Sequence, residues 1–155
     1  MKTIILYATK HGAAAEIAQR IADKIEGTGI YNLKQGNLSL DGYDNVIIGS
    51  SVYAGMIRKE AKTFISQNID ILKNKKLGLF ICGLSVSGDE EFFKNNFPAE
   101  LLEAIKVKSF LGGIFDPKKA NAFERFIIKL VSKKSIYVDT IDNSKIEQFV
   151  QAIKN

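Results

Sequence analysis

Cysteine and histidine each occur once in this chain, as Cys82 and His11, and long apolar runs are absent. A single cysteine cannot form a disulfide within the chain, so nothing in the sequence indicates an oxidising compartment. No stretch approaches the roughly 20 apolar residues of a membrane-spanning helix. The apolar run after Lys2 is interrupted by Lys10 and is too short for the core of a signal peptide. We therefore expect a cytoplasmic protein.

The overall composition is typical of one globular domain. The 155 residues are 46% hydrophobic and 25% charged, which supplies enough apolar side chains for a core and excludes a disordered tail. No internal repeat, low-complexity tract or linker divides the sequence. We therefore predict a single domain over residues 1–155.

The chain is basic, with a formal net charge of +5. Nucleic acid is not the expected partner, because the sequence has no helix-turn-helix, zinc or aromatic RNA-binding signature. Two interpretations of the charge stay open. One is a mildly basic surface, and the other is an anionic partner such as a carboxylate-bearing substrate, an acidic redox protein or an anionic membrane face.

Apolar runs predict the strands of a buried sheet. The runs at residues 3–8, 45–49, 77–83 and 107–115 are apolar without alternation, which is typical of parallel strands covered on both faces. Residues 30–40 are more polar, and we predict an edge strand there.

Apolar residues at helical spacing predict a helix after each strand. Gly27 and Gly29 are expected to end the first helix, and Pro98 to lie near the start of the third. Ser144, with Glu147 three residues later, predicts a capping box at the start of the last helix. The predicted helices cover residues 14–25, 61–72, 97–105, 123–131 and 146–153.

This alternation of strands and helices predicts a doubly wound α/β fold, a three-layer sandwich with a five-stranded parallel sheet in the order 2-1-3-4-5. Such sheets bind ligands beyond the carboxyl ends of their strands, where the strand order reverses. The loops to inspect are therefore residues 8–14, 50–58 and 84–89.

Several nucleotide-binding motifs are missing from these loops. A dinucleotide site needs G-x-G-x-x-G, whereas the first loop has only Gly12, and the P-loop motif G-x-x-x-x-G-K-[ST] is absent. A phosphorylated receiver domain would have an aspartate where the third strand ends, and this chain has Gly49, Ser50 and Ser51. FMN is the remaining common ligand of this fold.

The turn at residues 9–14 resembles the phosphate loop T/S-x-T-G-N-T of the flavodoxin superfamily. Thr9 matches the first hydroxyl position, and His11 stands where the second threonine would be. Ala13 and Ala14 replace the asparagine and the last threonine of the pattern. The resemblance implies that the FMN phosphate is bound by Thr9 and by the backbone N–H groups at the start of the first helix.

Lys10, His11 and Gly12 complete this loop. The resemblance places the side chains of Lys10 and His11 beside the phosphate and assigns Gly12 to the glycine of the motif. A histidine that merely fits the turn is the other interpretation of His11. We expect His11→Ala to weaken FMN binding.

A second resemblance covers almost the whole chain. Residues 43–55, and residues 112–116 followed by 122–131, are similar to the flavodoxin-domain branch that includes menaquinone-dependent protoporphyrinogen dehydrogenase. Plain flavodoxins pass almost directly from the last strand to the last helix, whereas this chain inserts residues 116–141. The resemblance implies bound FMN, oxidation of a tetrapyrrole precursor in heme biosynthesis, and electron delivery to a quinone.

Two further loops are expected to contact the flavin ring. The resemblance places the ring of Tyr53 against the flavin, where stacking contributes about 0.5–1.5 kcal/mol. Gly55 is expected to permit unusual dihedral angles or close approach of the backbone. With residues 9–14, the predicted cofactor contacts are Ser50, Ser51, Val52, Tyr53, Ala54, Gly55, Leu84, Ser85, Val86, Ser87 and Gly88.

No catalytic role is predicted for the remaining cysteine, acidic residues and basic residues. Cys82 is expected in the core, and Asp89, Glu90 and Glu91 are expected to charge a helix start rather than to bind metal. A basic cluster in the insertion is either a solvated face or a site for propionate groups or an anionic membrane. It comprises Lys118, Lys119, Arg125, Lys129, Lys133 and Lys134, within residues 118–134.

The sequence therefore predicts an FMN-binding, flavodoxin-like oxidoreductase without a metal, of the protoporphyrinogen or quinone type. No residue is identified as a general base. Its partners would be a small-molecule substrate or quinone, or a redox partner protein. Two alternatives stay open. One is a flavodoxin-type electron carrier without enzymatic activity. The other is a binding domain without flavin, because Ala13 and Ala14 replace two side-chain donors of the phosphate loop.

Overall fold

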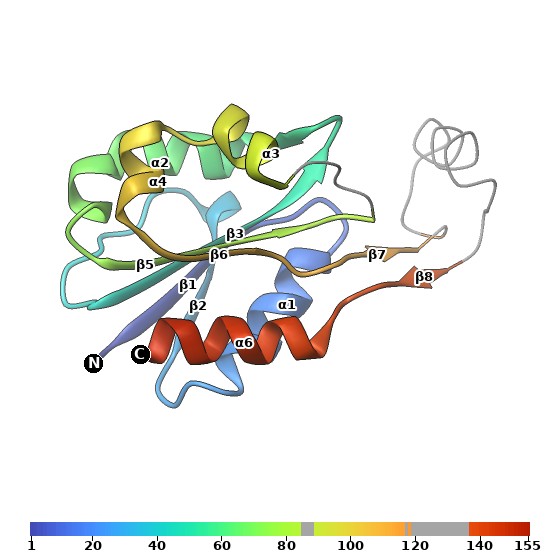
Figure 1. Cartoon of the computed structure of the whole chain (residues 1–155), viewed down its shortest axis with the longest axis horizontal. Helices are drawn as coiled ribbons and strands as arrows, with labels where there is room; N and C mark the ends of the chain where they lie inside the picture. Colours follow the sequence, from blue (N-terminus) through green and yellow to red (C-terminus); the bar gives the residue numbers. More distant parts are fainter. Residues whose placement is uncertain (85–88, 117, 119–136) are drawn as a thin grey trace.

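The computed structural model describes residues 1–84, 89–116, 118 and 137–155, and in these residues one sheet occupies the centre of the molecule. Its strands are β1 (Thr3–Ala8), β2 (Gly29–Asn32), β3 (Asn45–Tyr53), β4 (Met56–Ile57), β5 (Lys76–Cys82) and β6 (Ile105–Phe110). The order is β2-β1-β3-β5-β6, all parallel, with β4 antiparallel to the end of β3 (Figure 1). Apart from the short β4, this confirms the predicted order 2-1-3-4-5.

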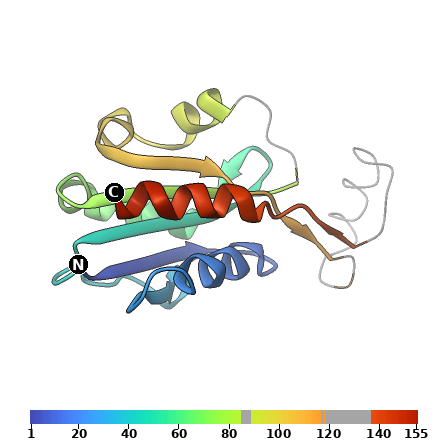
Figure 2. The same ribbon diagram turned by 60° about the horizontal axis from the view of Figure 1, so that its bottom comes forward.

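Helices cover both faces of the sheet. α2 (Lys59–Leu72), α3 (Asp89–Asn96) and α4 (Ala99–Ala104) lie on one face. α1 (Ala13–Ala22) and α6 (Asn143–Lys154) lie on the other (Figures 1 and 2). The predicted three-layer α/β sandwich is therefore confirmed. No helix in the described part of the chain is both long enough and apolar enough to cross a membrane.

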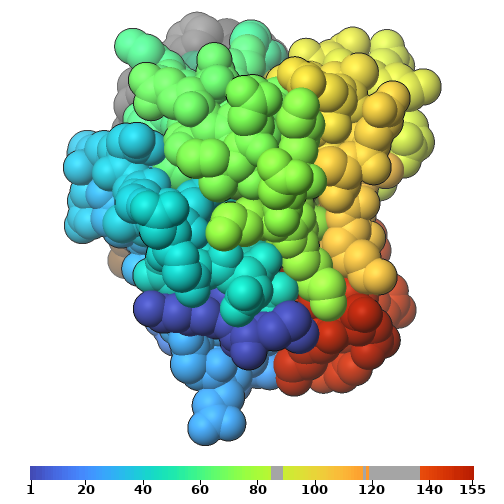
Figure 3. Space-filling model, turned by 90° about the vertical axis from the view of Figure 1, so that its left-hand side faces the viewer, coloured from blue at the N-terminus to red at the C-terminus, as the bar shows by residue number. Residues whose placement is uncertain are grey.

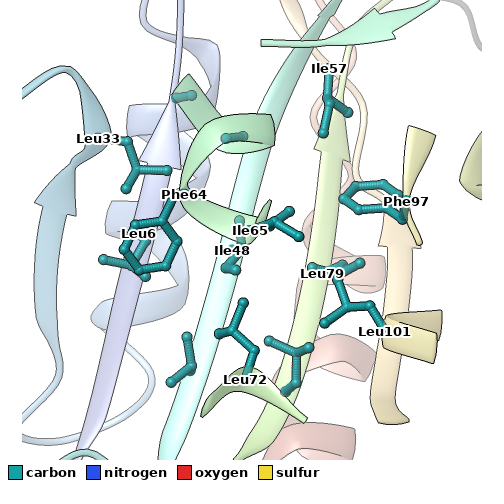
Figure 4. Packing of buried hydrophobic residues seen from close by; sticks show 14 of the residues in the cluster. Leu6, Leu33, Ile48, Ile57, Phe64, Ile65, Leu72, Leu79, Phe97 and Leu101 are labelled. Atoms are coloured by element: carbon teal, nitrogen blue, oxygen red, sulfur yellow. The ribbon is translucent and has the colours of Figure 1, made fainter. Parts of the chain in front are cut away.

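Each face of the sheet has its own hydrophobic core, because successive side chains of a strand point to opposite faces. In β1, Leu6 packs in the core beneath α2, α3 and α4, whereas Ile5 packs in the core beneath α1 and α6. Figure 4 shows Phe64 of α2 beside Leu6 of β1. Burial on both faces explains why the strands are apolar without alternation.

A close contact between neighbouring strands marks the middle of the α1 and α6 core. Gly49 of β3 pairs in register with Phe80 of β5, whose ring lies over the glycine. A Cβ atom at Gly49 would lie 1.9 Å from Cζ of Phe80. Phe80 is fully buried and meets Phe149 of α6 edge to face, with 6.4 Å between ring centroids. The absent side chain at Gly49 therefore makes the space for the ring.

The predicted fourth central strand, residues 107–115, is wrong in its bounds. β6 ends at Phe110, and the chain turns away at Gly112, which has a φ of 87°. β7 (Ile114–Phe115) then pairs with β8 (Val138–Asp139) as a separate antiparallel ribbon. The apolar pattern continues through the turn because Leu111 and Phe115 are both buried.

The edge strand predicted at residues 30–40 is shorter than expected. β2 ends at Asn32, where the side chain oxygen accepts a hydrogen bond of 2.9 Å from the N–H of Lys34. This contact caps the 3-10 turn η1 (Leu33–Gln35). An asparagine side chain that binds its own backbone competes with strand pairing, so it ends the strand here.

Several helix boundaries also differ from the prediction. α1 ends at Ala22 rather than near Ile25, and the segment predicted as one helix over 97–105 lies mainly in α4, with α3 before it. The last helix is capped by Asp142, whose carboxylate accepts from the N–H of Lys145 at 3.1 Å, and not by the predicted Ser144 box. The helix predicted at 123–131 lies outside the described residues.

The two ends of the chain lie close together at the amino edge of the sheet. Figure 3 shows this side, with the dark blue start of the chain next to the red end of α6. The carboxyl ends of the parallel strands are on the opposite side, where β7 and β8 also leave the sheet (Figure 2).

Candidate functional site

Three predicted site loops begin at one edge of the sheet. β1, β3 and β5 are parallel neighbours in register, with Ala8 opposite Ser50 and Ser51 opposite Cys82. β1 and β5 therefore end side by side, at what we call the carboxyl edge, whereas β3 continues to Tyr53, so that residues 50–53 are strand residues and not part of a loop as predicted. This is the position where a doubly wound sheet binds its ligand.

The first loop ends in an uncapped helix. Gly12 precedes α1 in the left-handed conformation, with φ 99° and ψ −5°, and no described side chain caps the helix. Thr9 instead stabilises the turn itself, because its Oγ1 accepts a 2.9 Å hydrogen bond from the N–H of Gly12. The first N–H groups of an α-helix have no partner within the helix, so this end of α1 offers donors to an anion.

Ala13 and Ala14 face the core rather than the loop. They are 8% and 0% exposed and pack in the same cluster as Ile5 and Ile17. Methyl groups at these positions allow α1 to lie close to the sheet. Any contact of these two residues with a ligand therefore comes from the backbone rather than from the side chain.

The second loop is a tight hairpin between β3 and β4. Tyr53 pairs with Met56, and the two residues between them, Ala54 and Gly55, have φ values of 51° and 76°. Positive φ at both central residues is typical of a type I′ hairpin turn. No heavy atom lies within 4 Å of a Cβ built at Gly55, so the backbone conformation, and not crowding, favours glycine here.

Tyr53 and Lys10 bring the first two loops together. The tyrosine is 43% exposed, and Nζ of Lys10 lies 4.5 Å from the centroid of its ring. An ammonium group over an aromatic face is attracted by about 0.5–1 kcal/mol at exposed sites. The contact places positive charge beside an exposed aromatic ring. His11 is half-buried in the same loop.

Ser50 and Ser51 have different environments at the end of β3. The Ser50 hydroxyl donates to the Ser51 carbonyl and accepts from the N–H of Arg58, both at 2.9 Å, so it ties β3 to the start of α2. The Ser51 hydroxyl is buried and has no hydrogen-bond partner in the described part of the chain. Because an unsatisfied buried hydroxyl is costly, Ser51 is suited to bind a ligand.

The third loop begins at Gly83 and Leu84, which are both half-buried, and residues 85–88 lie outside the described residues. Gly113 packs directly on this start, since a Cβ at Gly113 would lie 2.7 Å from the carbonyl carbon of Gly83. The N–H of Gly83 donates to the Gly112 carbonyl at 3.0 Å. Gly112 and Gly113 lead into the insertion and, with Thr140, form what we call its base. This base is therefore fixed to the carboxyl edge.

The base of the insertion is closed by Thr140. Its N–H donates to the Gly113 carbonyl at 2.8 Å, and its Oγ1 accepts from the N–H of Gly113 at 3.1 Å. Lys118 is exposed. The other five residues of the predicted basic cluster lie outside the described residues.

Cys82 is a core residue, as predicted. It is 0% exposed, and burial raises the pKa of its thiol to about 12. The thiolate is the reactive form, so Cys82 is not a nucleophile at neutral pH. Asp89, Glu90 and Glu91 form the first turn of α3, as expected, and the described residues contain no cluster that could hold a metal ion.

Asn96 is a polar residue near the site that the sequence did not reveal. It is 9% exposed at the end of α3, and its amide contacts the backbone of the β3–β4 hairpin. No spacing or motif marks such a residue, because its partners are about 40 residues away in the sequence.

Two surface hollows are lined by α2 and its neighbours. One of about 300 Å³ lies between the turn after η1 and α2, and one of about 500 Å³ lies between α2 and the end of α3. Neither is lined by residues of the 9–14 loop or by Tyr53. Neither hollow is therefore part of the predicted cofactor site around the first loop and Tyr53.

Solved structures show the same fold at low sequence identity. Flavodoxin 1 from Bacillus cereus is 16% identical over 86% of this chain and 99% of its own, with a TM-score of 0.54. A flavoprotein from Lactobacillus acidophilus in complex with FMN is 19% identical over 72% and 93%, with a TM-score of 0.53. The chain spans only 30% of the Flv1 flavodiiron core from Synechocystis, at 16% identity and a TM-score of 0.55.

Sequence comparison identifies the family. No curated protein matches the sequence significantly. The model of the family described as "Flavodoxin domain" matches residues 4–142, which is most of the chain and includes all three loops of the carboxyl edge. Together with the observed strand order and the uncapped helix after β1, this match shows that the chain belongs to the flavodoxin domain family.

Proposed function

We propose that this protein binds FMN at the carboxyl edge and acts as an FMN-dependent oxidoreductase. The single observation that carries the proposal is the joining of two features at that edge. The N-terminus of α1 has no side-chain cap among the described residues. The exposed ring of Tyr53 contacts Lys10, which belongs to the loop that leads into α1. FMN has a phosphate for the first feature and an aromatic ring system for the second.

The residues present fit this cofactor. The backbone N–H groups after Gly12 would bind the phosphate, together with Thr9, Lys10 and His11, and the field of the helix adds about 1 kcal/mol. The buried Ser51 hydroxyl, which lacks a partner among the described residues, would donate to a polar atom of the cofactor. FMN, when bound, supplies the redox chemistry, and the protein supplies binding and orientation.

For the substrate, we propose oxidation of a protoporphyrinogen-type tetrapyrrole with a quinone as acceptor. The support is the resemblance of residues 43–55 and 112–116 to that branch, and the insertion whose base is fixed at the carboxyl edge through Gly83 and Gly113. The positive net charge suits a substrate that carries carboxylates. A flavodoxin-type electron carrier is the second candidate, because the Bacillus cereus flavodoxin covers 86% of this chain.

The first experiment is an FMN titration of the purified protein, followed by visible absorbance and thermal unfolding. We expect flavin absorbance to remain with the protein after gel filtration and the Tm to rise with FMN concentration. Tyr53→Leu should weaken binding about 2- to 12-fold, which corresponds to the loss of one aromatic stacking contact. Tyr43→Leu is the matched control, because Tyr43 carries a similar contact with Lys2 at 4.9 Å but lies at the amino edge.

The outcomes separate the candidates. A chain that neither retains FMN nor gains thermal stability from it would exclude both redox functions and would leave a binding domain without flavin. Turnover of protoporphyrinogen with a quinone, measured anaerobically on the FMN-loaded protein, would support the enzyme. FMN binding without turnover of either compound would favour the electron carrier.

A second prediction concerns His11. We expect His11→Ala to weaken FMN binding because a side-chain N–H donor beside the phosphate is lost, with an effect on the order of threefold to tenfold. His11→Arg should retain most of the affinity, since it also supplies N–H donors at this position. Equal dissociation constants for the wild type and His11→Ala in a flavin fluorescence titration would show that the histidine only fits the turn.

A further inference from the structure

We propose that Asn96 is the positioning residue of the β3–β4 hairpin, and that it holds Tyr53 in the orientation that binds the flavin. This inference rests on the proposed FMN site. Asn96 belongs to α3, and its described hydrogen bonds go to Gly55, Ile57 and Phe92 rather than to Tyr53, so it acts through the backbone of the hairpin.

The amide of Asn96 grips the hairpin at two points. Its Nδ2 donates to the Gly55 carbonyl at 3.2 Å, and its Oδ1 accepts from the N–H of Ile57 at 3.0 Å. The second hydrogen of Nδ2 goes to the Phe92 carbonyl within α3, at 3.0 Å. Gly55 lies at the turn and Ile57 lies in β4, so one side chain fixes both the tip of the hairpin and its returning strand.

The far end of the hairpin is anchored, because Ile57 is buried and the N–H of Arg58 bonds the Ser50 hydroxyl, whereas its tip is exposed. β4 has two residues, and the exposed pair Tyr53 and Met56 are 43% and 51% accessible. A two-stranded hairpin is at best marginally stable by itself in water. Ala54 also has a φ of 51°, in a region that costs an alanine about 1–2 kcal/mol. Such a backbone persists only where its surroundings hold it in place.

Asn96 belongs to a buried part of α3 and of the turn that follows it. Its chain neighbours Phe92, Phe93 and Phe97 are buried as well, and the rings of Phe93 and Phe97 stack with 5.7 Å between their centroids. The N–H of Phe97 also donates to the Phe93 carbonyl at 3.0 Å. The Asn96 amide therefore connects the hairpin at the carboxyl edge to the buried side of α3.

An amide of this length is the side chain that fits these partners. Aspartate would keep an acceptor for the N–H of Ile57, but a carboxylate oxygen would then face the carbonyls of Gly55 and Phe92. Two oxygens without a hydrogen between them repel each other, and a buried charge would lack a donor on that side. Asn96→Asp is therefore nearly isosteric but is expected to release the hairpin tip.

The test compares two buried asparagines. Asn68 of α2 is 7% exposed and also donates to the carbonyl four residues earlier, that of Phe64, at 2.8 Å. It also donates to Oδ1 of Asn37 at 3.1 Å, and it has no described hydrogen bond to residues 53–57 of the hairpin. Asn68→Ala is therefore matched to Asn96→Ala in burial and in local chemistry, but it leaves the carboxyl edge intact.

We expect both alanine variants to lower the Tm, and only Asn96→Ala to weaken FMN binding. The apparent affinity is proportional to the fraction of molecules in which the hairpin is correctly formed. If Asn96→Ala lowers this fraction to about 10–30%, the affinity falls about 3- to 10-fold. Asn96→Asp should weaken binding to a similar degree and serves if the alanine variant fails to fold. In a Tyr53→Leu background, Asn96→Ala should change the affinity by less than about twofold, because the residue through which it acts is gone.

Each result has one meaning. If the wild type binds FMN and Asn96→Ala and Asn96→Asp bind it equally well, the positioning role is wrong and the FMN site stands. The role is also wrong if Asn68→Ala weakens binding as much as Asn96→Ala, or if the Asn96→Ala effect is undiminished in Tyr53→Leu. If the wild type itself does not bind FMN, the proposed function fails and this inference falls with it.

Discussion

Replacing Gly49 with alanine is expected to lower the free energy of unfolding by about 3 kcal/mol, the upper part of the usual range for overpacking a core. The new Cβ would lie 1.9 Å from Cζ of Phe80 and 2.3 Å from both Cε atoms. Phe80 cannot move away easily, because it is fully buried and packs edge to face against Phe149. Urea unfolding followed by circular dichroism measures the change.

A control and a rescue accompany this substitution. Gly83→Ala places a Cβ 3.6 Å from Cβ of Val52, an ordinary contact, and should cost less than about 1 kcal/mol. Combining Gly49→Ala with Phe80→Leu should restore part of the lost stability relative to the sum of the single changes, because the smaller side chain leaves space. A Gly49→Ala protein as stable as the wild type would contradict the tight contact between β3 and β5.

Replacing Gly112 with alanine is expected to cost a similar amount, also about 3 kcal/mol, for two reasons. The residue has a φ of 87°, and its Cβ would lie 2.0 Å from the carbonyl oxygen of Thr140 and 2.6 Å from the carbonyl carbon. Both atoms belong to the backbone, so relief requires the chain before α6 to move. Hydrogen exchange at the N–H of Thr140, which bonds the Gly113 carbonyl, should accelerate with it.

Gly42→Ala separates backbone strain from collision. Gly42 has a φ of 80°, close to that of Gly112, but no heavy atom lies within 4 Å of its Cβ position. Its substitution should cost about 1 kcal/mol, the cost of the left-handed conformation by itself. If Gly112→Ala lowers the free energy of unfolding by no more than Gly42→Ala, the backbone at Thr140 moves aside at no measurable cost. The inferred tight packing at the base of the insertion would then be wrong.

The sheet was predictable because its signal is local. The apolar runs at residues 3–8, 45–49 and 77–83 are dictated by burial on both faces of each strand, and the alternation with helices then leaves few topologies. The turn after β6 was not predictable. Leu111 and Phe115 keep the apolar pattern, and what bends the chain is its fit against Thr140, 27 residues further on.

The candidate site was predictable to a similar extent and for the same reason. The turn at residues 9–12 follows from local sequence, Tyr53 was assigned to the site by the resemblance to flavodoxins, and the structure brings Lys10 and Tyr53 together. The roles of Ser50, Ser51 and Asn96 arise from contacts between distant segments. Nothing in the types of these residues says which hydroxyl is engaged, which lacks a described partner, or which amide clamps a hairpin.

The ribbon of β7 and β8 has a consequence for how such a protein changes over time. Phe115 and Val138 are paired neighbours in an antiparallel ribbon, about 5 Å apart between Cα atoms, although 22 residues separate them in the sequence. A segment joined at two adjacent points can be lengthened, shortened or exchanged while the sheet beneath it keeps its geometry. The length and the sequence between Phe115 and Val138 can therefore change, in evolution or by engineering, without a change in the register of the parallel strands.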